Sequence, residues 1–341
     1  MWLSNSSVGR KFVMALTGAF LVLFVTFHCL MNSIAIVWPV AYNSICEFLG
    51  ANWYALLASA VLAAFILIHI IYAVVLTMQN RRARGNNRYA VVRKPKTVEW
   101  SSQNMLVLGI VILAFLVVHM IQFWAKMQMA EIAGTVDVIP PAAGTLFLQE
   151  AFSLVWTPIV YIIGFIALWF HMNHGFWSMF QSIGWDNTVW IPRLKKIACW
   201  WATIVVLLFI AQAIVFTVKA REGFYKTDEA LRNQYKEMLV PMVEHDFGPD
   251  AIQISQAIKM MPYDQLSPAV KQQAEQLKSQ LNNPEAKAYF NQSPEGKKQL
   301  EAMQKQADGF NKLAGFFMYL EEGQPQTEPA MPGMPAQNPN N

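Results

Sequence analysis

Histidines inside long apolar stretches are the residues of this sequence that point most directly to chemistry. The sixth histidine, His245, lies in a polar region and is expected to be an ordinary solvated side chain; the other five are His28, His69, His119, His171 and His174. A single intramembrane histidine can serve as a helix–helix hydrogen-bonding group. Because four separate stretches each carry at least one, a set of metal ligands is favoured. Neutral imidazoles in pairs form the six-coordinate iron sites of electron-transfer proteins.

Five apolar stretches must position these histidines. A helix that crosses a hydrocarbon core needs about 20 residues, and backbone at that depth has to satisfy its own hydrogen bonds. The expected spans cover roughly 12–38, 53–78, 103–125, 150–178 and 196–218. Of the 341 residues, 55% are hydrophobic and only 14% are charged, against about a quarter charged in soluble domains. We therefore expect an all-α integral membrane bundle of five transmembrane helices with a C-terminal helical extramembrane extension.

The charges between the expected spans indicate how the chain crosses the membrane. Lysine and arginine accumulate in cytoplasmic loops. The alternate loops, 39–52 and 126–149, hold a single basic residue, Lys126. The other two loops hold Arg81, Arg82, Arg84, Arg88, Arg93, Lys94 and Lys96 in one case, and Arg193 and Lys195 in the other. We expect a cytoplasmic N-terminus, a first helix retained rather than cleaved as a signal peptide, and a C-terminus on the far side of the membrane.

This topology places the histidines at two depths. Counted from the cytoplasmic end of each span, His28 and His119 lie about 17 and 16 residues in, which is the outer half of the membrane. His69 and His171 lie about 11 and eight residues from that end, in the inner half. At ~1.5 Å rise per residue the two levels are on the order of 10 Å apart. We predict an outer pair, His28 with His119, and an inner pair, His69 with His171, each holding one haem iron.

One further histidine competes for the inner site. His174 shares a helix face with His171, but one iron accepts only one ligand from this helix. We favour His171, because Gly175, four residues on, leaves room on the same face for a porphyrin edge. His174 is then an alternative ligand or a contact for a propionate or water. An interfacial polar residue without such a role is an equal interpretation.

The rest of the sequence bounds the other functions. Three cysteines lie far apart, with no C-x-x-C pair, so neither an iron–sulfur cluster nor a disulfide scaffold is indicated. The net charge is only +4, and no nucleic-acid binding is expected. We assign a transmembrane domain to 1–222 and a helical soluble extension on the outer side to 223–322. Residues 323–341 are rich in Pro, Gln and Asn without periodicity and are expected to be disordered.

Over about residues 5–220, the chain resembles a known family: the single-chain, dihaem cytochrome b subunit of succinate:quinone oxidoreductases and quinol:fumarate reductases, of the five-helix type. The matching elements are one histidine in each of the second and third spans, and a His-Met-Asn-His-Gly-Phe-Trp run that begins at His171 and is followed by Gly184-Trp185. Further matches are Thr17-Gly18 about ten residues before His28, and Asn32 four residues after it.

The resemblance implies two b haems, with His28 and His119 on the distal one and His69 and His171 on the proximal one. It also implies a partner flavoprotein subunit, where succinate and fumarate interconvert at FAD, and an iron–sulfur subunit docked on the cytoplasmic face. The basic loop 81–96 fits that docking surface. Electrons would pass from the iron–sulfur clusters through both haems to a quinone, expected to be menaquinone. The anchor itself would bind no dicarboxylate.

The same resemblance implies a location and one proton-transfer residue. The location is the bacterial inner membrane, with a periplasmic C-terminus. Lipid would surround the bundle, and the heterotrimer could form a higher oligomer. In one branch of the family a glutamate of the first outer loop acts in quinol oxidation, and Glu47 is the candidate catalytic carboxylate here. An exposed loop acid is the competing interpretation. Some members also carry a proton-conducting glutamate two residues before the fourth ligand; this chain departs from that pattern with Trp169, so that proton path is not expected.

Two other functions stay open from the sequence. A cytochrome b561-like transmembrane electron carrier also places one histidine on each of four helices, but works without a soluble dehydrogenase. A membrane transporter or assembly protein without haem would use the histidines for proton transfer or packing.

Overall fold

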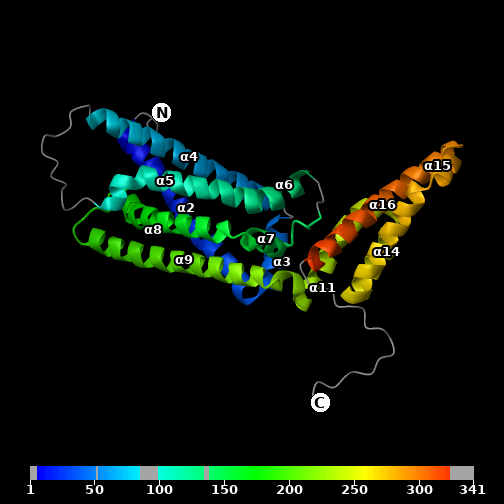
Figure 1. Cartoon of the computed structure of the whole chain (residues 1–341). Coiled ribbons are helices and arrows are strands. Elements are labelled where there is room, and N and C mark those ends of the chain that lie inside the picture. The colour runs from blue at the N-terminus through cyan, green and yellow to red at the C-terminus, as the bar shows by residue number, and fades with distance from the viewer. Residues whose placement is uncertain (1–5, 51–52, 85–98, 134–137, 323–341) are drawn as a thin grey trace, which may run out of the picture. The chain divides into compact units, whose positions relative to one another are not determined.

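The computed structural model describes residues 6–50, 53–84, 99–133 and 138–322, and every regular element in these ranges is a helix. The predicted all-α class is therefore confirmed for the described part of the chain. Two compact units are present, Met1–Tyr263 and Asp264–Asn341. The first unit contains the long apolar helices (Figure 1).

Within the described residues, five helical runs are long and apolar enough to cross a membrane, as predicted. Their outward faces carry exposed large apolar side chains such as Leu23, Leu67 and Ile204, which fit hydrocarbon and not water. The chain is a membrane protein. The runs are α2 (Ser7–Val37), α4 (Trp53–Arg84), α5 (Trp100–His119) continued through the π-helical turn η1 (Met120–Trp124) into α6 (Ala125–Ala133), α8 (Trp156–Ser182) and α9 (Trp190–Arg221).

Helix α8 is the one against which most of the bundle packs. It contacts α2, α5 and α9, whereas α4 packs mainly against α2 and buries no residue of its apolar window. Gly164 of α8 allows a close approach to α5, because a Cβ at this position would lie 2.5 Å from Phe115 Cγ. Small residues let membrane helices come together in this way. The approach lies one turn before His119, which ends α5.

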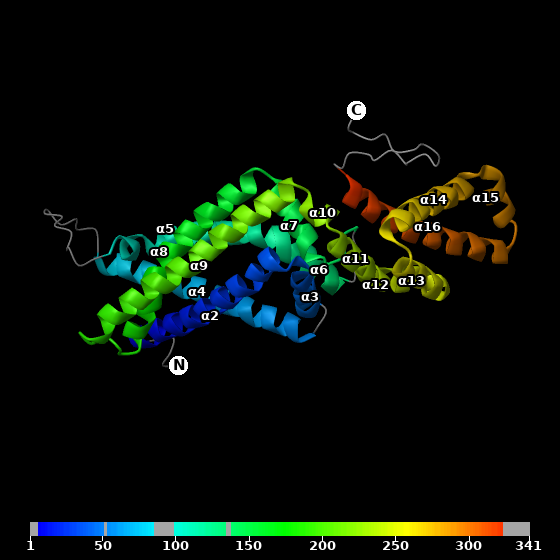
Figure 2. The same ribbon diagram turned by 90° about the horizontal axis from the view of Figure 1, so that it is seen from below.

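Short helices cover one end of the bundle. Their residues lie mostly in the two segments predicted from the sequence to be loops, 39–52 and 126–149. The helices are α3 (Pro39–Gly50), α6 and α7 (Gly144–Ser153), which we call the lid. Proline at the first position of α3 suits a helix start, since its missing N–H would have no partner there in any case. Almost every residue of α7 is buried. Helix α3 contacts both α6 and α7, and α7 also contacts α10 (Phe224–Thr227), which follows the last span (Figure 2).

The fourth span begins at Trp156, not at residue 150 as predicted. Leu154 is extended and separates α7 from α8. Pro158 therefore falls in the first turn of α8, where a missing N–H leaves no bond unmade. In one helix continuous from residue 150, its ring would clash with the carbonyl of Leu154. The break explains why an apolar stretch that is continuous in sequence forms two helices.

The chain beyond α9 continues in the same compact unit. Gly223, with φ of 69°, turns the backbone between α9 and α10. Thr145 Oγ1 of α7 lies 2.7 Å from Tyr235 Oη and 2.9 Å from Asn43 Oδ1, and all three residues are fully buried. Through Tyr235, these hydrogen bonds join the segment that follows the last span to the lid helices. Its helices are α10, α11 (Glu229–Met238), α12 (Val240–Phe247), the 3-10 turn η2 (Gly248–Asp250) and α13 (Ala251–Met260).

The second compact unit is helical as well. It is formed by α14 (Tyr263–Asn282), α15 (Pro284–Phe290) and α16 (Pro294–Glu321). Glu321 near the end of α16 accepts hydrogen bonds from Ser267 and Lys271 of α14. The tail predicted to be disordered, 323–341, lies outside the described residues.

Candidate functional site

The histidines form two pairs, each bridging two helices. His28 of α2 faces His119 at the end of α5, with ring centroids 5.8 Å apart and ring planes at 89°. His69 of α4 faces His171 of α8, with centroids 6.2 Å apart and planes at 65°. The side chains that were paired by depth are therefore neighbours in the structure. Residues from four helices, far apart in the sequence, meet at these two positions.

The distances within each pair suit a shared metal ion. Imidazole nitrogens bind transition metals at about 2 Å, so two ligands on opposite sides of one ion have ring centroids roughly 6 Å apart. Across the described residues, no cluster of three or more His, Cys, Asp or Glu side chains is placed to hold a metal. Two imidazoles supply two ligands, and a haem iron needs two axial ligands because the porphyrin supplies four. The donor set fits haem better than a bare ion.

A chain of hydrogen bonds supports His119 from behind. Its Nδ1 atom lies 3.2 Å from Tyr161 Oη. The Tyr161 hydroxyl donates to Gln122 Oε1 at 2.9 Å, and Gln122 Nε2 donates to Thr157 Oγ1 at 3.0 Å. Because the hydroxyl proton of Tyr161 is used on Gln122, its oxygen is left to accept from His119. The proton of His119 then sits on Nδ1, which leaves Nε2 as the free ligand atom.

The π-helical turn η1 places Gln122 in this chain. A π-helix has a wider turn than an α-helix and is often found at functional sites. Here it begins at Met120, directly after His119, and ends at Trp124, where the α-helix resumes. Gln122 is buried and directed toward α8, and neither Gln122 nor Tyr161 was among the predicted site residues. A glutamine three residues after an intramembrane histidine was the signal that could have found it.

The second pair is supported more simply. Thr17 Oγ1 lies 3.2 Å from His69 Nδ1 and is also within hydrogen-bonding distance of the carbonyl oxygens of Val13 and Met14. With its proton given to one of those carbonyls, the hydroxyl accepts from His69 and leaves Nε2 free. The buried Nδ1 of His171 has no hydrogen-bond partner among the described residues.

Aromatic rings enclose the His28–His119 pair. Phe24 stacks on His28 with centroids 5.4 Å apart, and Phe115 and Phe123 lie 5.9 Å and 5.3 Å from His119. Phe165 and Phe209 stack on each other at 5.1 Å and link α8 to α9 nearby. Such surroundings are apolar and strengthen the hydrogen bonds made within them.

Gly175 lies one turn beyond His171 on α8, near the other pair. A Cβ added at this glycine would meet no atom within 4 Å, so the space beside it is open. The role of Gly175 in admitting a porphyrin edge stays a prediction.

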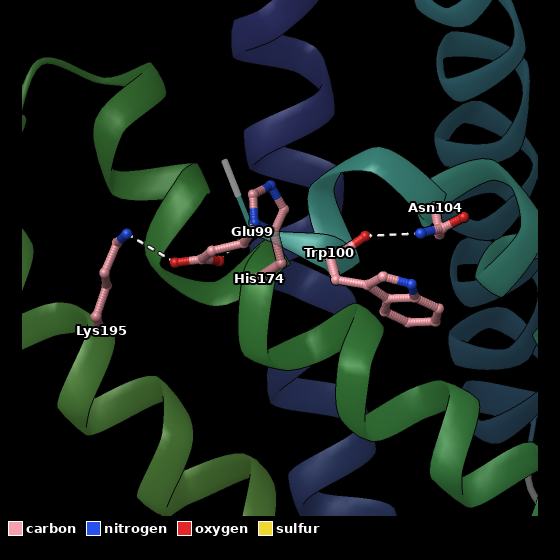
Figure 3. A network of polar contacts seen from close by, with 5 residues as sticks. All are labelled: Glu99, Trp100, Asn104, His174 and Lys195. Carbon is pink, nitrogen blue, oxygen red and sulfur yellow. Dashed lines mark hydrogen bonds and ion pairs between the residues drawn. The ribbon is translucent and has the colours of Figure 1, made fainter. Parts of the chain in front are cut away.

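His174 belongs to a polar cluster at the other end of the bundle from the lid. Its Nδ1 atom lies 3.2 Å from Glu99 Oε2, and Lys195 Nζ donates to Glu99 Oε1 at 2.7 Å (Figure 3). The same lysine lies over the ring of Trp177, which also packs against His174. Burial alone would raise the pKa of Glu99, but hydrogen bonds from Lys195 and His174 lower it below its ordinary value. His171, one turn earlier, is the residue that faces His69.

Glu47 lies on the exposed face of α3, in the lid. Its neighbour Cys46 points the other way and packs against Gly144 of α7. The loop 81–96 is described only as far as Arg84, so most of the predicted docking segment lies outside the described residues.

Comparison with known proteins gives no further guide. No family model, no curated protein and no solved structure matches this chain.

Proposed function

We propose that this chain is the membrane anchor subunit of a succinate dehydrogenase or fumarate reductase, carrying electrons between an iron–sulfur subunit and menaquinone through two b haems. The observation that carries the proposal is the pair of facing imidazoles at two positions in the bundle, drawn from four different helices. A porphyrin completes each set to six ligands and supplies a one-electron carrier when bound.

The protein's own residues then have defined roles. His28 and His119 would hold one haem, and His69 and His171 the other. Tyr161 accepts a hydrogen bond from Nδ1–H of His119, and Thr17 accepts one from Nδ1–H of His69. These bonds fix the tautomers needed for ligation through Nε2. A site with two protein ligands on each iron has no open position, so the chemistry is electron transfer rather than oxygen binding.

The two ends of the bundle would face different partners. In a bacterial inner membrane, the end with Glu99, Lys195 and exposed Arg193 would be cytoplasmic and would receive the iron–sulfur subunit, which in turn contacts the FAD-containing flavoprotein. The lid end would then lie on the periplasmic side, with the quinone near the His28–His119 pair. Glu47 is the candidate proton donor or acceptor for that quinone.

The direct test is a reduced-minus-oxidised spectrum of the purified full chain with a haem count. Two b-type haems per chain are expected. A chain without a b-type band would favour the transporter or assembly function, and one haem per chain would contradict the paired-ligand scheme. Copurification of a flavoprotein and an iron–sulfur protein separates the proposed complex from a cytochrome b561-like carrier, which would purify alone and show no succinate or fumarate activity.

Replacing Glu47 by Gln tests the quinone role by itself. We expect slower quinone turnover by the intact complex with both haems retained. Unchanged turnover would make Glu47 an exposed loop residue.

A further inference from the structure

Three of the four histidines differ in the hydrogen bonds available to Nδ1, the ring nitrogen that would not bind the iron. His119 has a three-member chain, from Tyr161 through Gln122 to Thr157. Nδ1 of His69 lies within hydrogen-bonding distance of one hydroxyl, that of Thr17. The same hydroxyl is also within reach of two backbone carbonyls of α2, the helix that carries Thr17. His171 has a buried Nδ1 with no partner among the described residues.

The chain behind His119 is built by specific backbone and side-chain features. The π-helical turn directly after His119 changes the direction of the residues that follow, so that Gln122 reaches α8. Gln122 and Thr157 are both buried, and Tyr161 is buried among the rings of Phe115, Phe152 and Phe165. A polar chain at this depth is costly unless each member finds a partner, and these bonds provide the partners.

Such a chain changes the ligand chemically. An imidazole that donates its Nδ1 proton to a good acceptor becomes a more basic ligand through Nε2. Tyr161 is a good acceptor because its own proton is given to Gln122, and consecutive hydrogen bonds in an apolar setting strengthen each other. A more basic axial ligand stabilises the oxidised iron relative to the reduced iron, which lowers the reduction potential.

We propose that Tyr161 and Gln122 are positioning residues that fix the tautomer of His119 and lower the reduction potential of the haem held by the His28–His119 pair. This inference rests on the proposed haem ligation. The reduction potentials of the two haems would then differ because of side chains that bind neither iron.

The test is a redox titration of the purified full-length chain, followed by its haem absorbance and by the low-spin signals in its electron paramagnetic resonance spectrum. Tyr161→Phe removes only the hydroxyl and keeps the ring in its aromatic surroundings. We expect both haems to remain, one potential to move upward with a changed low-spin signal, and the other potential to stay in place. Thr17→Val is the matched control, because it should move only the potential of the haem held by His69.

Two further variants and the haem content of the unaltered chain distinguish support for this inference from its failure. His119→Ala identifies which titration step belongs to the His28–His119 pair. If Tyr161→Phe loses that haem, Thr157→Val replaces it as the test, since it cuts only the far end of the chain; an upward shift supports the inference and an unmoved potential overturns it. Two retained haems with unmoved potentials in Tyr161→Phe also overturn it. Absence of haem from the unaltered chain would instead contradict the proposed function itself.

Discussion

The two histidine pairs lie in the same bundle, but they are enclosed in different ways. The His28–His119 pair lies toward the lid, where aromatic rings, a π-helical turn and a buried hydrogen-bond chain surround it. The His69–His171 pair lies toward the end with Glu99 and Lys195, where one of the four helices, α4, packs mainly against α2. Among the described residues, the short lid helices cover one end of the bundle, and no comparable short helices are described at the other end.

The largest expected effect separates the two pairs directly. His119→Ala removes one ligand of one pair, so we predict the loss of one haem of two, with the other retained. His171→Ala should remove the other haem. Haem counts with a redox titration of each purified variant measure this. If His119→Ala and His69→Ala abolish the same titration step, the pairing is wrong.

The sequence was sufficient for the five long apolar helices and for which histidines lie next to each other, because both depend on patterns that the membrane imposes. A hydrocarbon core requires long apolar helices, and helical rise fixes the depth of each histidine. The lid was missed because α3 and α7 are short and belong to stretches with few charges, where a helix and a loop have similar composition. Tyr161 and Thr157 were missed because their role depends on the packing of α5 against α8, which periodicity alone does not predict.

A second prediction compares two glycines of neighbouring helices. Gly164 of α8 lies against Phe115 near the His28–His119 pair, whereas a Cβ added at Gly109 of α5 would meet no described atom within 4 Å. Gly164→Ala must displace Phe115 and push α5 away from α8, and we expect a loss of about 1–3 kcal/mol of stability from overpacking. Gly109→Ala is the control and should leave stability unchanged or slightly raised, since alanine is the better helix former.

Thermal unfolding of the detergent-solubilised protein measures both glycine variants. The spectrum of the haem held by His28 and His119 should also change in Gly164→Ala, because the Tyr161–His119 bond crosses the same helix pair. Equal effects of the two substitutions would mean that Gly164 and Gly109 are packed alike.

A third prediction concerns the bonds that close the lid. Asn43 Oδ1 accepts from the backbone N–H of Thr145, and the site is fully buried. Asn43→Ala leaves that N–H without a partner, so we expect a loss of about 1–2 kcal/mol. Asn104 is the comparison at the other end, because its one side-chain hydrogen bond among the described residues goes to the Trp100 carbonyl of its own helix; Asn104→Ala should cost much less.

Unfolding temperatures of these two asparagine variants provide the measurement. Asn43→Ala should also loosen α11, which Tyr235 joins to the same network, and increase its cleavage by protease. A larger effect from Asn104→Ala would reverse the comparison between the lid end and the opposite end.

The smallest expected effect is a pH-dependent one at the end of the bundle opposite the lid. Burial raises the pKa of Glu99, but Lys195 and His174 stabilise the carboxylate by more, so the pKa in the folded chain lies below its ordinary value of 4.5. The contribution of Glu99 to stability is therefore complete above about pH 4.5 and is lost as the pH falls through the lowered pKa. The Glu99 side chain is 37% exposed, so solvent limits the contribution to about 0.2–1 kcal/mol.

Glu99→Gln should accordingly lower the unfolding temperature slightly at about pH 7, and the difference from the unaltered protein should shrink as the pH falls below about 4.5. Glu150→Gln is the control in the lid region, where the Glu150 side chain pairs with the exposed Lys126. Because Lys126 is the one partner of this side chain among the described residues, its substitution should have the weaker effect at neutral pH. If the unfolding temperature of Glu99→Gln stays lower by the same amount in acid, the glutamine disturbs packing. The polar contacts of Glu99 would then not stabilise this end of the bundle.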